Sequence, residues 1–469
     1  MRILLKCPTR SRPQQVIETL QKYVRLANSP KLMGIAVSCD LDDVSMTRNL
    51  VREEIETLMR KTEWGRVFYS DNHSKIEACN ANMNEIDYPW DIVVLVSDDM
   101  IPQVKGYDDI IRNHMVSRFP DRNGILWFND GCQGDKLNTL CIYGRAFYER
   151  QGYIYHPAYK SLFCDTELTD LCRTEYKNIC AYIPYCIIRH EHPGTGFADK
   201  MDSLYAANQR YWNDDMYTYI SRKRYEYDWS VMIPSLVGRE AGLKNVMDSI
   251  REKISRLAPE IRVEYCVDID NREVSIGIKR ERMLQAARGK YSSFIDDDDD
   301  ITDAYIEDLR ETIRGNYHVM RLYGQIKQYK FVHSTEMGLS SPMATSGENP
   351  VFQRPPNHLN PMLCDVAKLV HFKNAVHGED LDWAITMLKN GFLQNEYRRE
   401  PIQVHYIYNM GDRRVSIDAV LQQQNITYEK MLSLVFTPAG VIVGSAQKSQ
   451  DRKAPGGLRL GRLGFVSTQ

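Results

Sequence analysis

The sequence predicts an α/β protein made of two tandem domains whose mixed sheets are mostly parallel. In both halves a short apolar strand is followed by a polar turn, an amphipathic helix and a second strand. This is the order of a βαβ unit, in which a crossover helix joins two parallel strands. In both halves a later apolar strand then runs into aspartates. The agreement of the whole ordered set favours a divergent tandem duplication.

Length and charge limit the classes of protein to which the chain can belong. Its 469 residues include 60 Lys and Arg against 62 Asp and Glu, a net charge of −2, and 43% of them are hydrophobic. At roughly 100–200 residues per domain, this length fits two to four domains. The balance excludes a protein that coats nucleic acid by bulk charge, although a local basic groove stays compatible with it. The apolar fraction excludes an acidic disordered chain.

The first half opens with a predicted strand over residues 3–7 and a polar turn over residues 8–13. Ser11 followed three residues later by Gln14 is a capping-box pattern, which predicts a helix start. One face of this helix is apolar, with Val16, Ile17, Leu20 and Val24. A second strand, over residues 32–37, leads to Asp40.

The second half repeats these elements. A strand over residues 230–233 leads to Pro234, which follows Pro8 by 226 positions. The next helix is again apolar on one face, with Leu243, Val246, Met247, Ile250, Ile254 and Leu257. A strand over residues 261–267 ends at Asp268, which we pair with Asp40 at a spacing of 228 positions.

Acidic residues follow the next predicted strand in both halves. Residues 92–96 lead into Ser97, Asp98 and Asp99, and residues 293–295 lead into five aspartates, 296–300. In open α/β sheets, ligands bind outside the carboxyl ends of the strands, where such carboxylates can hold a hard divalent cation. Five adjacent like charges repel one another, so the second run predicts a bound counter-ion. A solvated acidic turn is the alternative.

Two further pairs of residues share one spacing. Asp165 and Asp380 are 215 positions apart, and so are His190 and His405. We therefore expect a first domain over residues 1–220, a linker over 221–228 and a second domain over 229–435. The basic remainder, 436–469, shows no sustained periodicity and predicts a flexible tail, with an arm that touches nucleic acid as the alternative.

Cysteine usage and hydropathy bear on the compartment. The eleven cysteines include no Cys-x-x-Cys pair, which argues against a zinc ribbon and a thioredoxin-like site. The N-terminal apolar stretch is broken by Lys6 and Pro8, as expected of a first strand and not of a signal peptide. No apolar run approaches the roughly 18–20 residues of a membrane span. We expect a soluble, cytoplasmic protein, in the host cytoplasm if a virus encodes it.

These motifs resemble those of family-2-like glycosyltransferases with the GT-A fold, and the tandem arrangement resembles enzymes encoded by tailed bacteriophages and large DNA viruses. Residues 294–299 are similar to the extended Asp-x-Asp signature, and 378–383 to the Glu-Asp motif of the catalytic base. The first half matches less well. Val96 stands where the first Asp of Asp-x-Asp is expected, and Cys164 replaces the Glu before Asp165.

The resemblance implies roles for individual residues. Asp380 and Asp165 would be the catalytic bases of the two sites. A Mn²⁺ or Mg²⁺ cofactor would be held by Asp298, Asp299 and His405 in the second half, and by Asp98, Asp99 and His190 in the first, with His192 as the alternative to His190. The nucleotide-sugar would contact Pro234, Ser235, Asp268, Lys279, Arg280 and Asp296, and in the first half Pro8, Thr9, Arg10 and Asp40.

The expected activity is that of a metal-dependent inverting glycosyltransferase. Its donor would be a nucleotide-diphosphate sugar, with a UDP-sugar expected, and its acceptor a hydroxyl, with a hydroxymethylated pyrimidine of viral DNA as one candidate. A protein or cell-surface glycan acceptor stays open. A metal-dependent nucleotidyltransferase and a non-catalytic nucleotide-sugar or glycan-binding protein are the alternatives. Asp380 argues against the last, because a decayed site would not keep its base.

Overall fold

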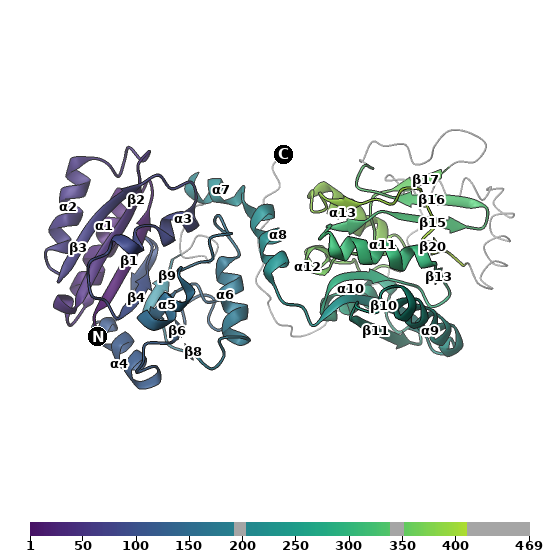
Figure 1. Ribbon diagram of the computed structural model, residues 1–469, viewed down its shortest axis with the longest axis horizontal. Helices are drawn as coiled ribbons and strands as arrows, with labels where there is room; N and C mark the ends of the chain where they lie inside the picture. Colours follow the sequence, from purple (N-terminus) through teal and green to yellow (C-terminus); the bar gives the residue numbers. More distant parts are fainter. Residues whose placement is uncertain (192–202, 338–350, 410–469) are drawn as a thin grey trace, which may run out of the picture. The chain divides into compact units, whose positions relative to one another are not determined.

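The computed structural model describes residues 1–191, 203–337 and 351–409 and divides into two compact units. The first unit starts at Met1 and runs to Lys223, and the second starts at Arg224 (Figure 1). His192, residues 410–435 and the expected tail lie outside the described residues. Both units combine helices with mixed, mostly parallel sheets, which confirms the predicted fold class. Within the described ranges, no helix has the length and apolar character needed to cross a membrane.

A seven-stranded sheet forms the centre of the first unit, in the order β3-β2-β1-β4-β7-β6-β8. Only the two pairings of β7, with β4 and with β6, are antiparallel. The strands are β1 (Ile3–Thr9), β2 (Met33–Asp40), β3 (Trp64–Ser70), β4 (Ile92–Leu95), β6 (Ile125–Phe128), β7 (Ile142–Gly144) and β8 (Cys180–Ile183). A separate antiparallel pair joins β5 (Met100–Pro102) to β9 (Ile188–His190).

Helices connect these strands. They are α1 (Pro13–Leu26), α2 (Asn49–Met59), α3 (Lys75–Asn80), α4 (Tyr107–Arg118), α5 (Arg145–Gln151), α6 (Cys164–Arg173), α7 (Ser203–Gln209) and α8 (Trp212–Arg222), with short 3₁₀ turns at Pro30–Leu32 and Met83–Glu85. The expected capping box at Ser11 is wrong. Helix α1 starts at Pro13, which suits a first helical position, and Ser11 lies before it with a φ of 60°.

The second unit has a six-stranded sheet in the order β11-β10-β12-β18-β14-β19. Its strands are β10 (Tyr227–Leu236), β11 (Val263–Asp270), β12 (Gly289–Phe294), β14 (Val319–Met320), β18 (Met362–Leu363) and β19 (Glu396–Tyr397). A second sheet, β13-β20-β15-β16-β17, consists of Asp300–Ile301, Tyr406–Ile407, Leu322–Ile326, Tyr329–His333 and Val351–Arg354.

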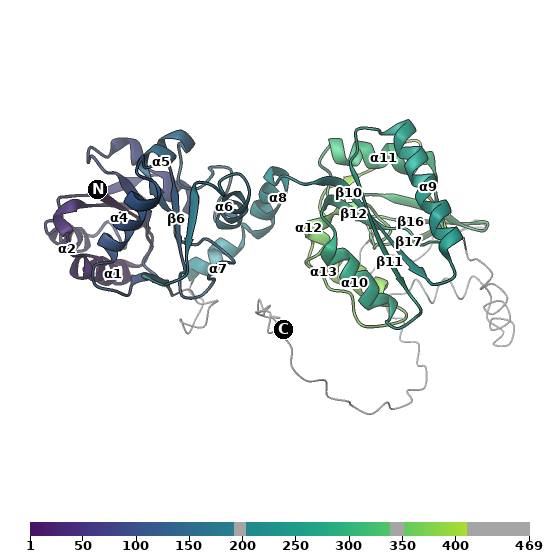
Figure 2. The ribbon, with the colours of Figure 1, turned by 90° about the horizontal axis from the view of Figure 1, so that it is seen from below.

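In the described part of this unit the helices are α9 (Glu240–Leu257), α10 (Ile276–Ala286), α11 (Asp303–Arg314), α12 (Cys364–Ala367) and α13 (Glu379–Lys389). Helices α9 and α11 lie side by side on one face of the six-stranded sheet, and α10 and α13 lie together on the other (Figure 2). The apolar stripe predicted for α9 explains its position, because its buried side chains are Leu243, Val246, Ile250 and Ile254.

The two units share one sheet topology. Without its edge strand β3, the sheet of the first unit has the same strand order and the same strand directions as that of the second. The pair β5–β9 likewise corresponds to β13–β20. This correspondence, together with the strand registers, identifies equivalent positions in the two units.

The central strands β1 and β2 are buried along almost their whole length. Strands covered on both faces read as near-continuous apolar runs, as the sequences of β1 and β2 do. Lys6 interrupts this pattern, and its ammonium donates to Ser38 Oγ and to the carbonyl of Ala78. The register of the central strands places Met232 at the equivalent position of the second unit.

Candidate functional site

Three carboxylates converge just beyond the end of β12. One oxygen from each of Asp296, Asp298 and Asp299 can be chosen so that all three lie within 4.8 Å of one another. The backbone turn explains their convergence, because the amide of Asp299 donates to the carbonyl of Asp296 at 3.1 Å. Oxygen ligands in such a group suit Mn²⁺ or Mg²⁺.

Asp297, the middle residue of the Asp-x-Asp pattern, holds the turn in place. It is buried, accepts a hydrogen bond from Ser235 Oγ at 2.6 Å and pairs with Arg239 at 2.9 Å. Arg239 also reaches Asp298 at 2.5 Å. Ser235 therefore ties the end of β10 to the acidic turn. The cluster is made by the other three carboxylates, while that of Asp297 is directed toward Ser235 and Arg239.

The carboxylate of Asp299 lies close to the other negative charges of the cluster. Its carboxylate accepts hydrogen bonds from Tyr406 Oη and from the backbone amide of Asn409, both at 2.7 Å. Burial and the nearby charge of Asp296 nevertheless raise the pKa of Asp299 to about 8. A divalent cation would supply the missing positive charge, so this donor set fits a metal ion.

Arg280 links the acidic cluster to the expected base motif. It is buried on α10, pairs with Glu379 and lies 3.7 Å from Asp296. Lys279 faces elsewhere, since its ammonium donates to Asp270 and to the carbonyl of Ser235, both at 2.6 Å. Of the two expected cationic residues, Arg280 is therefore the one near the cluster.

Asp380 lies in the first turn of α13, with about a fifth of its side chain exposed. Gly378 precedes the helix with a φ of 78°, a conformation that glycine adopts without strain. Arg354 lies 3.3 Å and His358 3.8 Å from Asp380 Oδ2. Burial opposes the charged carboxylate, but Arg354, His358, Arg280 and the backbone amide of Leu381 together outweigh it and hold the pKa of Asp380 below its usual range. Asp380 is thus ionised and accessible, as a proton acceptor must be.

His405 is placed apart from the cluster. Its ring is fully buried, with Nδ1 accepting from the amide of Tyr323 at 3.1 Å and Nε2 2.8 Å from Asp308 Oδ2. Both ring nitrogens are thus engaged in the core. The strand pairing instead puts Tyr408 at the position that His190 holds in the first unit. The shared sequence spacing therefore does not mark equivalent positions.

The aspartates that were expected to contact the nucleotide also occupy equivalent positions different from those expected. The registers of β1 with β2 and of β10 with β11 make Asp270, and not Asp268, the counterpart of Asp40. Asp268 pairs with Arg282, with Nη2 and Oδ1 2.6 Å apart. Pro234 lies within β10, opposite Asp268 on β11, as Pro8 lies within β1.

In the first unit, Asp98 and Asp99 have different environments. Asp98 pairs with Arg12 at 2.7 Å and lies 3.4 Å from Thr9 Oγ1, which makes it the counterpart of Asp297. Asp99 corresponds to Asp298, and its carboxylate lies 3.4 Å from His190 Nε2. The structure therefore brings Asp99 and His190 together and directs Asp98 toward Arg12.

Neutral residues replace several charges of the second unit. The interpretation of Val96 as the substituted Asp is wrong, because the register equates Val96 with Ile295 and Ser97 with Asp296. Equivalent N-caps at Ser74 and Ser275 equate Cys79 with Arg280. The starts of α6 and α13 equate Cys164 with Glu379. Thus the linked group Asp296–Arg280–Glu379 has the uncharged counterpart Ser97–Cys79–Cys164.

Asp165 occupies the position of Asp380, in the first turn of α6. Desolvation disfavours the Lys75 ammonium, but Cys164, Cys79, Asp165 and Asp99 together raise its pKa above the ordinary value. Nearer to β2, Arg10 pairs with Asp40 at 2.7 Å. Two expected nucleotide contacts of this unit, Arg10 and Asp40, therefore lie together.

Four residues of the second site were not predicted from the sequence: Arg239, Arg354, His358 and Tyr408. Comparison of the repeats could have found Arg239, because it precedes α9 as Arg12 precedes α1. The others have no such signal. Arg354 and His358 belong to the segment between β16 and β18, and pairing through β20 places Tyr408.

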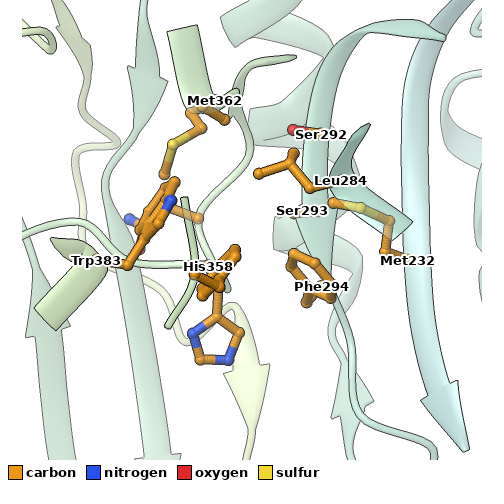
Figure 3. Close-up of a pocket in the computed structure, with 11 residues that line it drawn as sticks. Met232, Leu284, Ser292, Ser293, Phe294, His358, Met362 and Trp383 are labelled. Atoms are coloured by element: carbon orange, nitrogen blue, oxygen red, sulfur yellow. The ribbon is translucent and has the colours of Figure 1, made fainter. Parts of the chain in front are cut away.

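A small cavity lies behind this site (Figure 3). Its lining is mostly apolar and includes Met232, Leu284, Phe294, Met362 and Trp383, with His358 at its border. With a volume of about 10 Å³ it could hold at most one water molecule. The cavity is therefore part of the core and not a substrate site.

Comparisons with known proteins give no family. No family profile and no curated protein matches the chain. A mannosyltransferase from Pyrobaculum calidifontis in complex with GDP-Man and Mn²⁺ matches at 13% identity and a TM-score of 0.36, over 47% of this chain and 63% of that chain. S. aureus TarS 1-349 in complex with UDP matches at 12% identity and a TM-score of 0.33, over 70% and 96%. The chain thus spans less than two thirds of the mannosyltransferase. Similarity at this level carries no functional argument.

Proposed function

We propose that the second unit is a metal-dependent, inverting glycosyltransferase of the GT-A type. The observation that carries the proposal is the chain of contacts that runs from the acidic cluster through Arg280 to Glu379, the neighbour of Asp380. In this proposal the cluster is the cation-binding group, and Asp380, next to Glu379, is the proton acceptor. A cation can stabilise the departing diphosphate of a nucleotide-diphosphate sugar, and a carboxylate can take the proton of the acceptor hydroxyl.

The residues have separate tasks in this proposal. Asp296, Asp298 and Asp299 would hold Mn²⁺ or Mg²⁺, which when bound neutralises the departing diphosphate. Arg280 keeps Glu379, and with it the start of α13, next to the cluster. Asp380 takes the proton from the acceptor hydroxyl as its oxygen bonds to the anomeric carbon and the bond from that carbon to the diphosphate breaks. A single displacement of this kind inverts the anomeric centre.

We extend the proposal to the first unit, with Asp165 as base and Asp99 and His190 on the metal side. Its nucleotide contacts would be Arg10 and Asp40. In this proposal the two sites differ in strength of metal binding, because Ser97 offers only a neutral hydroxyl where the second unit has a carboxylate.

The acceptor carries a hydroxyl, and we keep a hydroxymethylated pyrimidine of DNA as one candidate in a cytoplasmic setting. A protein and a glycan are the others. Transfer to hydroxymethylcytosine-containing DNA, to a protein mixture and to oligosaccharides, each with radiolabelled donor, separates the three.

A donor panel tests the proposed reaction. The full chain is incubated with Mn²⁺ or Mg²⁺ and with UDP-glucose, UDP-GlcNAc or GDP-mannose, and release of nucleoside diphosphate is measured. We expect release with at least one donor and its loss on addition of EDTA. An unchanged rate in EDTA would remove the metal from the mechanism, and no release with any donor would remove the reaction.

A further inference from the structure

We propose that Arg354 and His358 are positioning residues that hold Oδ2 of Asp380 and so present its other oxygen, Oδ1, to the acceptor hydroxyl. This inference rests on the function proposed above. The two contacts come from one segment of the second unit, and both fall on the same carboxylate oxygen.

Arg354 is held firmly by the second sheet. It ends β17, pairs in register with His333 on β16, and its carbonyl accepts from the amide of Ser334 at 3.0 Å. Its side chain is 7% exposed, whereas that of Asp380 is 21% exposed. The guanidinium therefore approaches the carboxylate from the protein side. A buried, charged hydrogen-bond donor in this place fixes the orientation of a carboxylate better than an exposed one does.

His358 is fixed independently of Arg354. Its carbonyl accepts from the amide of Phe294 at 2.8 Å, at the end of the strand that leads into the acidic cluster. Its ring lies against that of Phe294, with centroids 5.8 Å apart (Figure 3). The residue is more than nine-tenths buried, and Nδ1 has no hydrogen-bond partner. A buried unpaired nitrogen 3.8 Å from a carboxylate can complete its hydrogen bonding by a small movement toward that oxygen.

Several charged or titratable groups face Asp380: Arg354 from β17, His358 from the loop that follows, Arg280 from α10, His333 from β16 and Glu379 on its own helix. Burial lowers the pKa of His333 to about 3 and that of His358 well below its ordinary value, so both rings are neutral near pH 7. Arg280 is engaged with Glu379. Arg354 is thus the cation whose charge favours the ionised form of Asp380 most, with Arg280 as a second one, and the neutral ring of His358 contributes orientation.

The pH dependence of turnover tests the role of Arg354. Nucleoside diphosphate release is measured with Mn²⁺ and with whichever of UDP-glucose, UDP-GlcNAc and GDP-mannose the wild type uses. We expect Arg354→Met to move the acidic limb of the kcat/KM profile upward by at least about one pH unit. Arg354→Lys keeps the charge and should restore the limb while kcat stays reduced. Arg321→Met removes another partly buried arginine of this unit, paired with Glu396, and serves as the control for stability.

A separate substitution tests His358. We expect His358→Phe to lower kcat about tenfold with the KM for donor unchanged, and His358→Gln to recover part of the loss. A wild-type pH profile in Arg354→Met, or a wild-type kcat in His358→Phe, overturns the corresponding assignment. Asp380→Asn, made in a chain that also carries Asp165→Asn so that the first unit contributes no turnover, tests the base itself. If this chain retains turnover, the proposed function fails; if it has none while Arg354→Met behaves as wild type, only the positioning role fails.

Discussion

At one pair of equivalent positions, the first unit has a buried charged residue and the second has an apolar one. Lys6 is buried in the central strand of the first unit, where Met232 stands in the second. Burial lowers the pKa of Lys6 to about 8 from an ordinary value of 10.5. Its hydrogen bonds to Ser38 and Ala78 satisfy the ammonium but do not abolish the cost of removing it from water.

This pKa makes the stability of the first unit depend on pH. Between pH 8 and 10.5 the lysine of the unfolded chain is still protonated while the folded one is neutral, so the unfolded state binds more protons. The free energy of unfolding therefore rises with pH in this window. Relative to Lys6→Met, the wild type should gain about 2 kcal/mol between about pH 7 and about pH 9.5.

Urea denaturation of both proteins at the two pH values measures this gain. Lys61→Met, at an exposed position, should show no such relative change and is the control. A constant difference between wild type and Lys6→Met across this range would contradict the account of Lys6.

The start of a helix positions the expected catalytic base. In both units the expected base lies in the first turn of a helix, α6 or α13, that begins after a residue of positive φ. That residue is Gly378 in the second unit and Phe163 in the first. Phe163 compensates for the strain by packing its ring against Trp212 and Tyr219. The chain thus turns sharply enough to aim the first helical turn at the site.

The glycine before α13 gives a test of this placement. Gly378→Ala meets no neighbouring atom but forces a left-handed conformation on alanine, which costs about 1–2 kcal/mol. Gly391→Ala, just beyond the same helix, has the same open surroundings and a φ of 63°. We expect similar losses of thermal stability from both substitutions. Only Gly378→Ala should lower kcat, by roughly tenfold, because only it moves Asp380; equal turnover in the two would argue against that role of the helix start.

At the scale of the whole molecule, the sequence predicted the fold better than it predicted the equivalence of single residues. Strand and helix periodicity lies in local sequence, so the α/β class could be predicted. Two position pairs failed, Asp40 with Asp268 and His190 with His405, because insertions change the spacing along the chain. The added strands β15–β17 of the second unit are one such insertion, and they also carry Arg354.

The directions of individual side chains could not be predicted from the sequence either. Charge alone predicts a cation site in the run of five aspartates, but which of their carboxylates converge depends on the turn after β12. The structure separates Asp297, which holds Ser235, from its neighbours. Contacts between residues that are far apart in the chain, such as that of Arg354 with Asp380, have no periodic signature and come only from the fold.

Metal binding should stabilise the second unit selectively. A ligand that binds only the folded state adds about 2.7 kcal/mol at a concentration of 100 times its Kd. We therefore expect Mn²⁺ to raise the melting temperature of the full chain and Asp298→Asn to abolish most of the shift. Asp248→Asn alters an exposed aspartate on α9 and should keep the full shift. An equal shift in both variants would place the ion elsewhere.

The most direct test of the central claim is nucleoside diphosphate release by Asp380→Asn beside Asp382→Asn, both in a chain that carries Asp165→Asn, with Mn²⁺ and a donor that the wild type uses. Both aspartates lie in the first turn of α13, but Asp382 is more exposed and pairs with Lys373 at 2.6 Å. The proposed role of Asp380 predicts that Asp380→Asn loses at least about 100-fold in kcat, as expected for removal of a general base, while Asp382→Asn stays within about twofold of the chain that carries Asp165→Asn alone. Equal activity of the two variants would contradict the assignment of Asp380 as the base.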